Sequence, residues 1–223
     1  MTTVGLVTTP RVKICGIRDV ADGVAAVDAG ADYIGVVFAE RVRRVGADVA
    51  AGVIRAVDGR AKGVGVFVDE DENDLLGLWS VVGFDIAQLH GSEAPDACDR
   101  LRVRGLEVWK AIRPRTPEEM TVGLARYCGA VDAILIEGFS AEAAGGTGTS
   151  FPYAWFEDVD RRAVPDIILA GGLTPANVAE AIAGVSPDIV DVSSGVESAP
   201  GVKSLAKIEA FISAVRAGEG GSE

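Results

Sequence analysis

A cysteine and a glutamate each close a short apolar run. Cys15 ends the stretch "VKIC" and Glu137 ends "AILIE", and a glycine follows each of them. A thiol becomes a useful proton acceptor once positive charge or a helix N-terminus lowers its pKa, and a carboxylic acid kept protonated by burial is a useful proton donor. The two side chains are a candidate base–acid pair. Packing as a small buried hydrophobe is the alternative for Cys15, and it is the role expected for Cys98 and Cys128, which fall in helical stretches.

Two glycine-rich loops contain groups that suit a phosphate. The stretches "AGGL" at 170–173 and "SSGVE" at 193–197 each follow an apolar run. Glycines let backbone N–H groups approach phosphate oxygens, and Ser193 and Ser194 add hydroxyl donors. Ordinary turns are the alternative, but two such loops together favour a phosphate cradle. The tract "GGTG" at 145–148 fits a lid, a phosphate nest or a linker equally well.

An arginine cluster and one imidazole complete the polar set. Arg41, Arg43 and Arg44 lie close together in an otherwise acidic chain. Such a cluster is either a solvated loop or a guanidinium offered to a substrate carboxylate, since the planar fork suits bidentate pairing. His90 is the only histidine. It fits an acid or base, but a supporting hydrogen-bond role is favoured.

Eight β-branched runs alternate with helical stretches, and these elements must position the reactive groups. The expected strands are 11–15, 33–38, 63–68, 85–89, 107–111, 132–136, 166–170 and 188–192. The expected helices are 19–29, 47–57, 71–82, 94–104, 117–127, 153–159, 175–183 and 204–217. Eight such units in 223 residues predict the α/β class and a single-domain (β/α)8 TIM barrel over 11–217. A doubly wound sheet is the alternative, but the first turn "CGIRD" lacks its glycine fingerprint. Residues 1–10 are expected to be an N-terminal extension and 218–223 a tail.

Strand alternation indicates which side chains face the barrel interior. Active sites of such barrels lie at the C-terminal ends of the strands. If Cys15 points into the barrel mouth, Lys13 points inward below it, and Val12 and Ile14 pack against helices. By the same rule, two further pairs share a face: Leu135 with Glu137, and Asp191 with Ser193.

Composition restricts the class of partner and the compartment. The net charge of −12 and the pI near 4.6 argue against duplex nucleic acid or an anionic membrane as a partner. Three cysteines without a CxxC pair argue against a disulfide framework or a zinc site and favour a reducing, cytoplasmic location. No apolar run approaches the roughly 18–20 residues that span a bilayer, and the start lacks the features of a secretory signal.

The motifs together resemble one enzyme family. "VKICGI", "AGADYIGVVF", "GVFVDE", "QLHG", "GGTG", "LAGGLTPANVAEAI" and "DVSSGVE…PGVK" occur in the order found in phosphoribosylanthranilate isomerases of tryptophan biosynthesis, from about residue 11 to 212. The resemblance implies a (β/α)8 enzyme that performs an Amadori rearrangement on a small phosphoribosyl substrate. It implies no cofactor and no metal. Monomer and homodimer both stay open.

The resemblance also implies roles for particular residues. Cys15 would be the general base that takes the proton from the sugar C2, and Glu137 the general acid that protonates the ribose ring oxygen. Arg44 would hold the anthranilate carboxylate, and His90 would lie with the substrate-binding residues. The segments that match the phosphate cradle contain Gly171, Gly172, Asp191, Ser193 and Ser194.

Three departures from the family pattern concern the loops and the acid. The family usually has aspartate where this chain has Glu137, and lysine where it has Thr149. The stretch "AERVRRVGAD" replaces a proline-containing loop. These changes keep two alternatives open: a paralogue that isomerises a related phosphosugar amine, and a catalytically silent binder of a phosphorylated metabolite.

Overall fold

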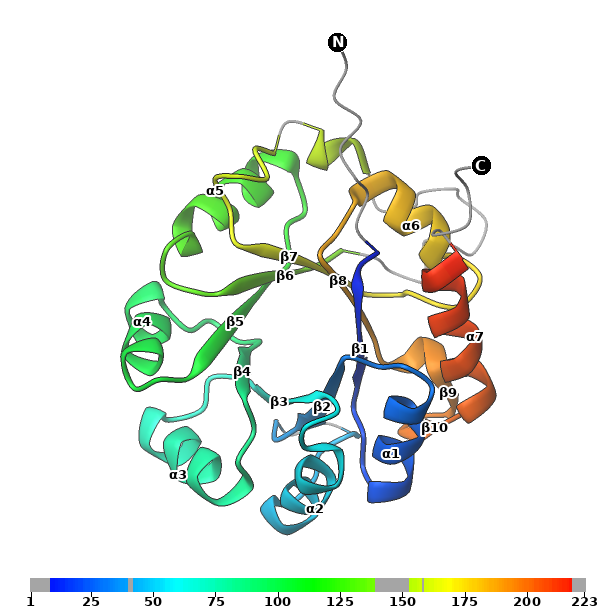
Figure 1. The fold of residues 1–223 in the computed structure, drawn as a ribbon. Coiled ribbons are helices and arrows are strands. Elements are labelled where there is room, and N and C mark those ends of the chain that lie inside the picture. The colour runs from blue at the N-terminus through cyan, green and yellow to red at the C-terminus, as the bar shows by residue number, and fades with distance from the viewer. Residues whose placement is uncertain (1–8, 40–41, 139–152, 158, 218–223) are drawn as a thin grey trace.

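Eight parallel strands form a closed barrel inside a layer of helices (Figure 1). The computed structural model describes residues 9–39, 42–138, 153–157 and 159–217. The barrel strands, each hydrogen-bonded to the next and the last to the first, are β1 (Arg11–Cys15), β2 (Tyr33–Val37), β3 (Lys62–Phe67), β4 (Ile86–Leu89), β5 (Glu107–Ile112), β6 (Ala133–Glu137), β7 (Asp166–Ala170) and β8 (Ile189–Val192). The predicted single-domain (β/α)8 barrel is confirmed.

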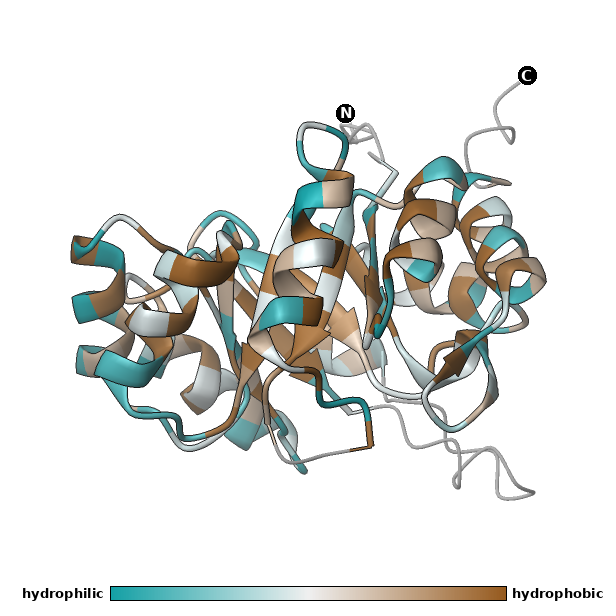
Figure 2. Cartoon of the chain, turned by 90° about the horizontal axis from the view of Figure 1, so that it is seen from below, coloured by the Kyte–Doolittle hydropathy of each residue, from teal (hydrophilic) through white to brown (hydrophobic). Residues whose placement is uncertain are grey.

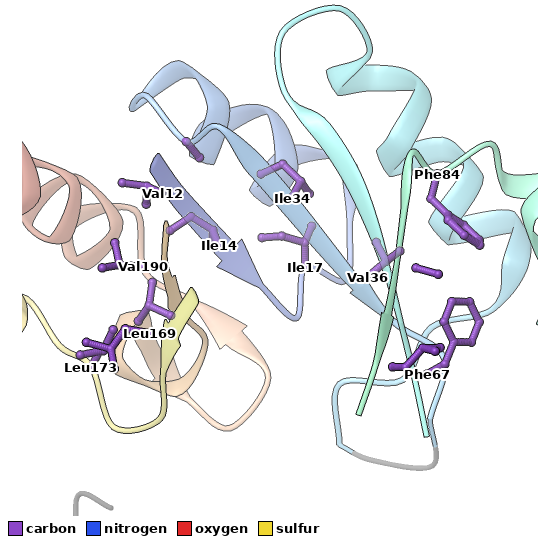
Figure 3. Close-up of a cluster of buried hydrophobic side chains, with 14 of the residues drawn as sticks. Val12, Ile14, Ile17, Ile34, Val36, Phe67, Phe84, Leu169, Leu173 and Val190 are labelled. Atoms are coloured by element: carbon purple, nitrogen blue, oxygen red, sulfur yellow. The ribbon is translucent and has the colours of Figure 1, made fainter. Parts of the chain in front are cut away.

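Strand alternation divides the buried side chains into two layers, as expected. Val12 and Ile14 of β1 belong to the outer core between strands and helices, with Val190 of β8 close by (Figure 3). Cys15 belongs to a separate cluster inside the barrel. Lys13 also points inside, where its Nζ donates to Asp191 Oδ2 at 3.1 Å. The alternation of side chains along the strand therefore places reactive groups inside the barrel and apolar groups under the helices.

The helices are short amphipathic segments that cover the outer core. They are α1 (Val20–Asp28), α2 (Ala47–Val57), α3 (Glu72–Val82), α4 (Pro95–Val103), α5 (Pro117–Tyr127), α6 (Val178–Val185) and α7 (Leu205–Arg216). Asp19, Asp71 and Thr116 cap α1, α3 and α5 with side-chain oxygens that accept backbone N–H groups. Figure 2 shows apolar residues through the strands and mixed apolar and polar residues along the surrounding helices.

Three elements differ from expectation. The expected helix 153–159 is a single 3₁₀ turn, η1 (Tyr153–Phe156), in an aromatic-rich stretch with poor helix propensity. Helix α6 begins at 178 rather than 175, because the Asn177 side chain accepts the N–H of Thr174 and holds a turn there. A segment that sequence reasoning missed lies between β8 and α7. It contains η2 (Ser194–Val196), β9 (Glu197–Ala199) and β10 (Val202–Lys203).

Several predictions fall on the ends and loops of the chain. The tail 218–223, most of the extension 1–10, Arg41, and the tract 145–148 with Thr149 lie outside the described residues. Cys98 is buried in α4 as expected. Cys128 is exposed, so its expected burial is wrong: it follows the last residue of α5, where its thiol contacts the carbonyl of Ala163. Within the described residues, no helix is both long and apolar enough to span a bilayer.

Candidate active site

A cavity of about 470 Å³ opens at the carboxyl ends of the barrel strands. It contains every described candidate site residue except Arg44, namely Cys15, His90, Glu137, Gly171, Gly172, Asp191, Ser193 and Ser194. Val37, Val66 and Val68 make an apolar wall on the β2–β3 side. The cavity therefore has an apolar end, a glycine-rich end on β7 and β8, and ionisable groups that open into the same space.

Cys15 lies at the end of β1 with 8% of its surface exposed. Burial raises the pKa of its thiol, because desolvation disfavours the thiolate. The nearby Lys13 ammonium acts in the opposite direction, and Asp191 adds to the upward shift. In the free protein, burial therefore outweighs the positive charge of Lys13, and Cys15 is a neutral thiol at pH 7.

Asp191 is a buried carboxylate with one oxygen left for a ligand. Its Oδ2 accepts from Lys13, while the buried Oδ1 has no hydrogen-bond partner among the described residues. A buried acceptor without a donor is costly, about 1–3 kcal/mol. Because the side chain lines the cavity, a ligand hydroxyl or amine is the natural donor. A carboxylate would repel a phosphate, so Asp191 suits another part of the ligand than the glycine loops do.

The loops after β7 and β8 pack tightly against each other. Gly171 and Gly172 adopt φ values of +89° and +67°, which only glycine adopts freely. A Cβ on Gly195 would lie 1.9 Å from the carbonyl oxygen of Leu173, so only glycine permits this approach. The Ser193 hydroxyl donates to the carbonyl of Cys15 at 3.1 Å. That contact ties β8 to β1 and occupies a hydroxyl proton expected to serve a phosphate.

Glu137 belongs to a set of four polar side chains in contact, with Gln88, His90 and Arg113. Its Oε2 contacts His90 Nε2 at 3.2 Å and also accepts from Arg113 Nε. Gln88 Nε2 lies 3.1 Å from His90 Nδ1 on the other side of the ring. The hydrogen bond from His90, reinforced by Arg113, lowers the pKa of Glu137 to about 2 although partial burial opposes it. The expectation that burial keeps Glu137 protonated is therefore wrong for the free protein.

The arginine cluster divides between the cavity and the surface. Arg43 lines the cavity and donates to both carboxylate oxygens of Glu197, each at 2.7 Å. Glu197 also accepts from Lys203 Nζ at 3.0 Å. Arg44, the residue that the family resemblance points to, is exposed, pairs with Val37 as an isolated bridge and does not line the cavity.

Sequence reasoning missed several of these polar groups. Gln88 and Arg113 carry no motif of their own, but Gln88 shares a strand face with His90 and Arg113 follows a strand end. Glu197 and Lys203 stand inside the motif "GVE…PGVK", which by itself indicates no role for them. Strand parity was a usable signal for Gln88. The pairing of Arg43 with Glu197, 154 positions away, had none.

A closed barrel with its cavity at the strand carboxyl ends and glycine loops after its last two strands defines the class of phosphate-binding (β/α)8-barrel enzymes. The family model for N-(5'-phosphoribosyl)anthranilate (PRA) isomerase matches residues 12–214. The chain belongs to the PRA isomerase family.

Individual relatives agree over nearly the whole chain. The N-(5'-phosphoribosyl)anthranilate isomerases of Rubrobacter xylanophilus and Geobacter sp. (strain M21) are each 42% identical, over 92% and 91% of this chain and 98% and 96% of their own lengths. The phosphoribosylanthranilate isomerase structure from Thermotoga maritima has a TM-score of 0.84 at 34% identity, covering 93% of this chain and 99% of its own. A phosphoribosylanthranilate isomerase in complex with reduced 1-(o-carboxyphenylamino)-1-deoxyribulose 5-phosphate has a TM-score of 0.82 at 32% identity and the same coverage.

Proposed function

We propose that this protein isomerises N-(5-phosphoribosyl)anthranilate to 1-(o-carboxyphenylamino)-1-deoxyribulose 5-phosphate, the third step from chorismate to tryptophan. Family membership supports the reaction, and the ligand named for a solved relative has the same carbon skeleton as the product. The observation that carries the proposal is the cavity itself. It joins a glycine-rich end for a phosphate and an apolar wall for an aromatic ring, and both Cys15 and Glu137 open into it.

Each reacting group has one role. Glu137 gives a proton to the ribose ring oxygen, the C1–O bond breaks, and the anilino nitrogen supplies the electron pair that forms an iminium ion. Cys15, as thiolate, then takes the proton from C2, which gives an enolamine that ketonises to the product. General acid–base catalysis of this kind contributes about 10²–10⁴-fold for each group.

The free protein holds both groups in the opposite protonation state, so in the productive complex a proton must leave Cys15 and one must reach Glu137. Arg113 is the donor that can leave Glu137, because its side chain is 56% exposed while His90 is largely enclosed. With Arg113 turned away, one of the two contacts that lower the pKa of Glu137 is lost, so its pKa rises and the carboxyl group takes up a proton more readily. We propose this rearrangement as part of the productive complex.

One assay tests the proposed reaction. Loss of anthranilate fluorescence reports turnover of the substrate, and Cys15→Ser and Glu137→Gln serve as chemically silenced controls. The unmodified protein is expected to turn over the substrate, and each variant to lose about 10²–10⁴-fold in kcat. Substrate binding without turnover by the unmodified protein would refute the reaction. Unchanged kcat in Cys15→Ser would refute the role of the thiol.

Two arginines are candidates for the anthranilate carboxylate. The family resemblance favours Arg44, whereas the cavity is lined by Arg43. The variants Arg43→Gln and Arg44→Gln distinguish them, because loss of a charged hydrogen bond of about 1.5–3 kcal/mol raises KM by about 10- to 100-fold. We propose Arg44 as the ligand in the bound state, and an unchanged KM in Arg44→Gln would transfer the role to Arg43.

A second candidate function rests on the departures in the loops and the acid. Glu137 in place of aspartate and Thr149 in place of lysine suit a paralogue that isomerises a related phosphosugar amine. Turnover of such an amine with a kcat/KM above that of phosphoribosylanthranilate would favour it. We place either enzyme in the cytoplasm, where its three free cysteines stay reduced.

A further inference from the structure

Gln88 is a fully buried amide behind the candidate site. It lies on β4, faces the barrel interior, and does not line the cavity. Its Nε2 contacts His90 Nδ1 at 3.1 Å, and its Oε1 is buried with no hydrogen-bond partner among the described residues. An amide with one satisfied and one orphaned end requires an explanation, since the orphan costs about 1–3 kcal/mol.

The partners of the imidazole supply that explanation. Glu137 Oε2 accepts from Arg113 Nε and lies 3.2 Å from His90 Nε2. These neighbours hold the pKa of Glu137 at about 2, so at neutral pH it is a carboxylate that only accepts. The His90 Nε2 that faces it must therefore carry a hydrogen. In the neutral ring Nδ1 is then a bare acceptor, and it needs a donor. Gln88 provides one only by presenting its NH₂ group, which leaves its oxygen buried without a hydrogen-bond partner among the described residues.

The reversed amide would be inconsistent with this arrangement. In a neutral ring, an oxygen of Gln88 aimed at Nδ1 requires the hydrogen to be there, which leaves Nε2 with a lone pair directed at the carboxylate of Glu137. Only a doubly protonated ring would suit the reversed amide. Oε1 of Gln88 is thus left without a partner because its NH₂ group satisfies Nδ1 of His90, which lets Nε2–H donate to Glu137.

The backbone on both sides of His90 is fixed independently. Lys110 Nζ donates to the carbonyl oxygens of Leu89 at 3.3 Å and Gly91 at 2.8 Å, and it forms an ion pair with Glu93 at 3.1 Å. Lys110 is almost completely buried. With the main chain held in this way, the amide of Gln88 needs to set only the proton position and the tilt of the ring.

We propose that Gln88 is a positioning residue that holds neutral His90 in the tautomer with its hydrogen on Nε2, so that His90 is a fixed hydrogen-bond donor to Glu137 rather than an acid or base itself. The proposal deepens the proposed function and rests on it for the role of Glu137. When Glu137 gives its proton to the ring oxygen, the carboxylate that forms meets an N–H already aimed at it. Donors placed in advance where charge develops lower the barrier without reorganisation.

The single histidine makes the tautomer directly measurable. With ¹⁵N-labelled imidazole, all histidine signals in the spectrum come from His90. At about pH 8.5, above the usual titration range of an imidazole, we expect a protonated Nε2 and an unprotonated Nδ1 in the unmodified protein. A protonated Nδ1 in that spectrum would overturn the proposal without reference to any variant or to any substrate.

Two variants of Gln88 and one control test the cause. Gln88→Met keeps the size of the side chain and removes the donor, so the two tautomers should mix. Gln88→Glu supplies only an acceptor, so the hydrogen should move to Nδ1. Glu137→Gln still offers an oxygen to Nε2–H and should retain the original tautomer. If Gln88→Met keeps the spectrum of the unmodified protein, Gln88 is not the residue that sets the tautomer.

Kinetics separate this proposal from the proposed reaction. In Gln88→Met we expect kcat to fall by about 10- to 100-fold, the range found when the partner that orients a metal-bound histidine is lost. KM should change less than kcat, because Gln88 is not part of the cavity wall. Mixed tautomers with undiminished kcat would refute the positioning role. An unmodified protein that turns over no substrate would refute the reaction and leave the spectroscopic result standing.

Discussion

At the scale of single residues, the site is a set of acid–base groups whose charges are determined by their neighbours. Cys15 is neutral because it is buried, and Glu137 is ionised because His90 and Arg113 donate to it. Each state is the opposite of the one that the proposed reaction uses. In the free protein the proton is therefore on Cys15 and not on Glu137, and the bound substrate must change the protonation state of both groups. Arg113 is the group best placed to control that shift, since it is the exposed donor.

Shortening the acid tests this account. Glu137→Asp removes one methylene, so the carboxylate can no longer reach both His90 and Arg113, and its pKa should rise. We expect kcat to increase by about tenfold for each unit of that rise, because more of the acid is protonated at a given pH. The measurement is kcat between about pH 5 and 9. Glu137→Gln is the control that cannot donate, and a lower kcat in Glu137→Asp would show that reach matters more than protonation.

At the scale of elements, the barrel itself could be predicted from the sequence and the connections could not. The strands were evident because β-branched runs and period-two alternation are local signals, and these also gave the inward directions of Cys15 and Lys13. The hairpin β9–β10 is held by Glu197, whose partner Arg43 lies 154 positions away, so no local pattern indicates it. The protonation states cannot be predicted from local patterns for the same reason, because they depend on side chains that only the closed barrel brings together.

The close packing of the loops after β7 and β8 predicts the effect of a single methyl group. In Gly195→Ala the new Cβ would clash with the backbone oxygen of Leu173, so the two loops must separate. If they bind the phosphate, the Kd for inorganic phosphate should rise by about tenfold or more, since errors near 1 Å can cost about 100-fold in a preorganised site. Gly77→Ala in α3 is the control. Beyond its own helix backbone, no atom of the described residues lies within 4 Å of the new Cβ, so this substitution should leave phosphate binding unchanged and stabilise the fold by about 0.5–1 kcal/mol.

The hairpin β9–β10 is held by a buried charge cluster, which makes it sensitive to loss of the central carboxylate. Glu197→Gln leaves Lys203 and Arg43 without their anion, and we expect a loss of about 3–5 kcal/mol in the free energy of unfolding. Urea denaturation measures it. Asp28→Asn breaks an exposed pair with Arg60 and should cost less than about 1 kcal/mol. Equal effects of the two substitutions would show that the hairpin contributes little to stability.

At the scale of the whole molecule, the acidic chain keeps its charges outside except at a few sites. Three lysines, Lys13, Lys110 and Lys203, are buried, and each is paired with a carboxylate. Two of these pairs adjoin the candidate site: Lys13 lies next to Cys15, and Lys203 donates to the carbonyl of Ser193 at 3.0 Å. The stability of the fold and the geometry of the site therefore depend on the same ionised groups, and both should respond to pH.

The pH limits of stability follow from the shifted groups. The hydrogen bond with His90 lowers the pKa of Glu137 from 4.5 to about 2. Burial opposes a similar shift in Glu197, but the hydrogen bonds from Arg43 lower its pKa to about 2 as well. Because the folded state binds these protons less tightly than the unfolded state, their stabilisation is complete above about pH 4.5 and is lost as the pH falls towards 2. Burial raises the pKa of Cys98 from 9.0 to about 11, so its contribution to stability is complete below pH 9 and is lost as the pH rises towards 11.

We therefore expect urea midpoints to decline on both sides of a plateau. Glu197→Gln should flatten the acid decline, and Cys98→Ala the alkaline one. An acid decline as steep in Glu197→Gln as in the unmodified protein would show that the unfolding protons bind elsewhere.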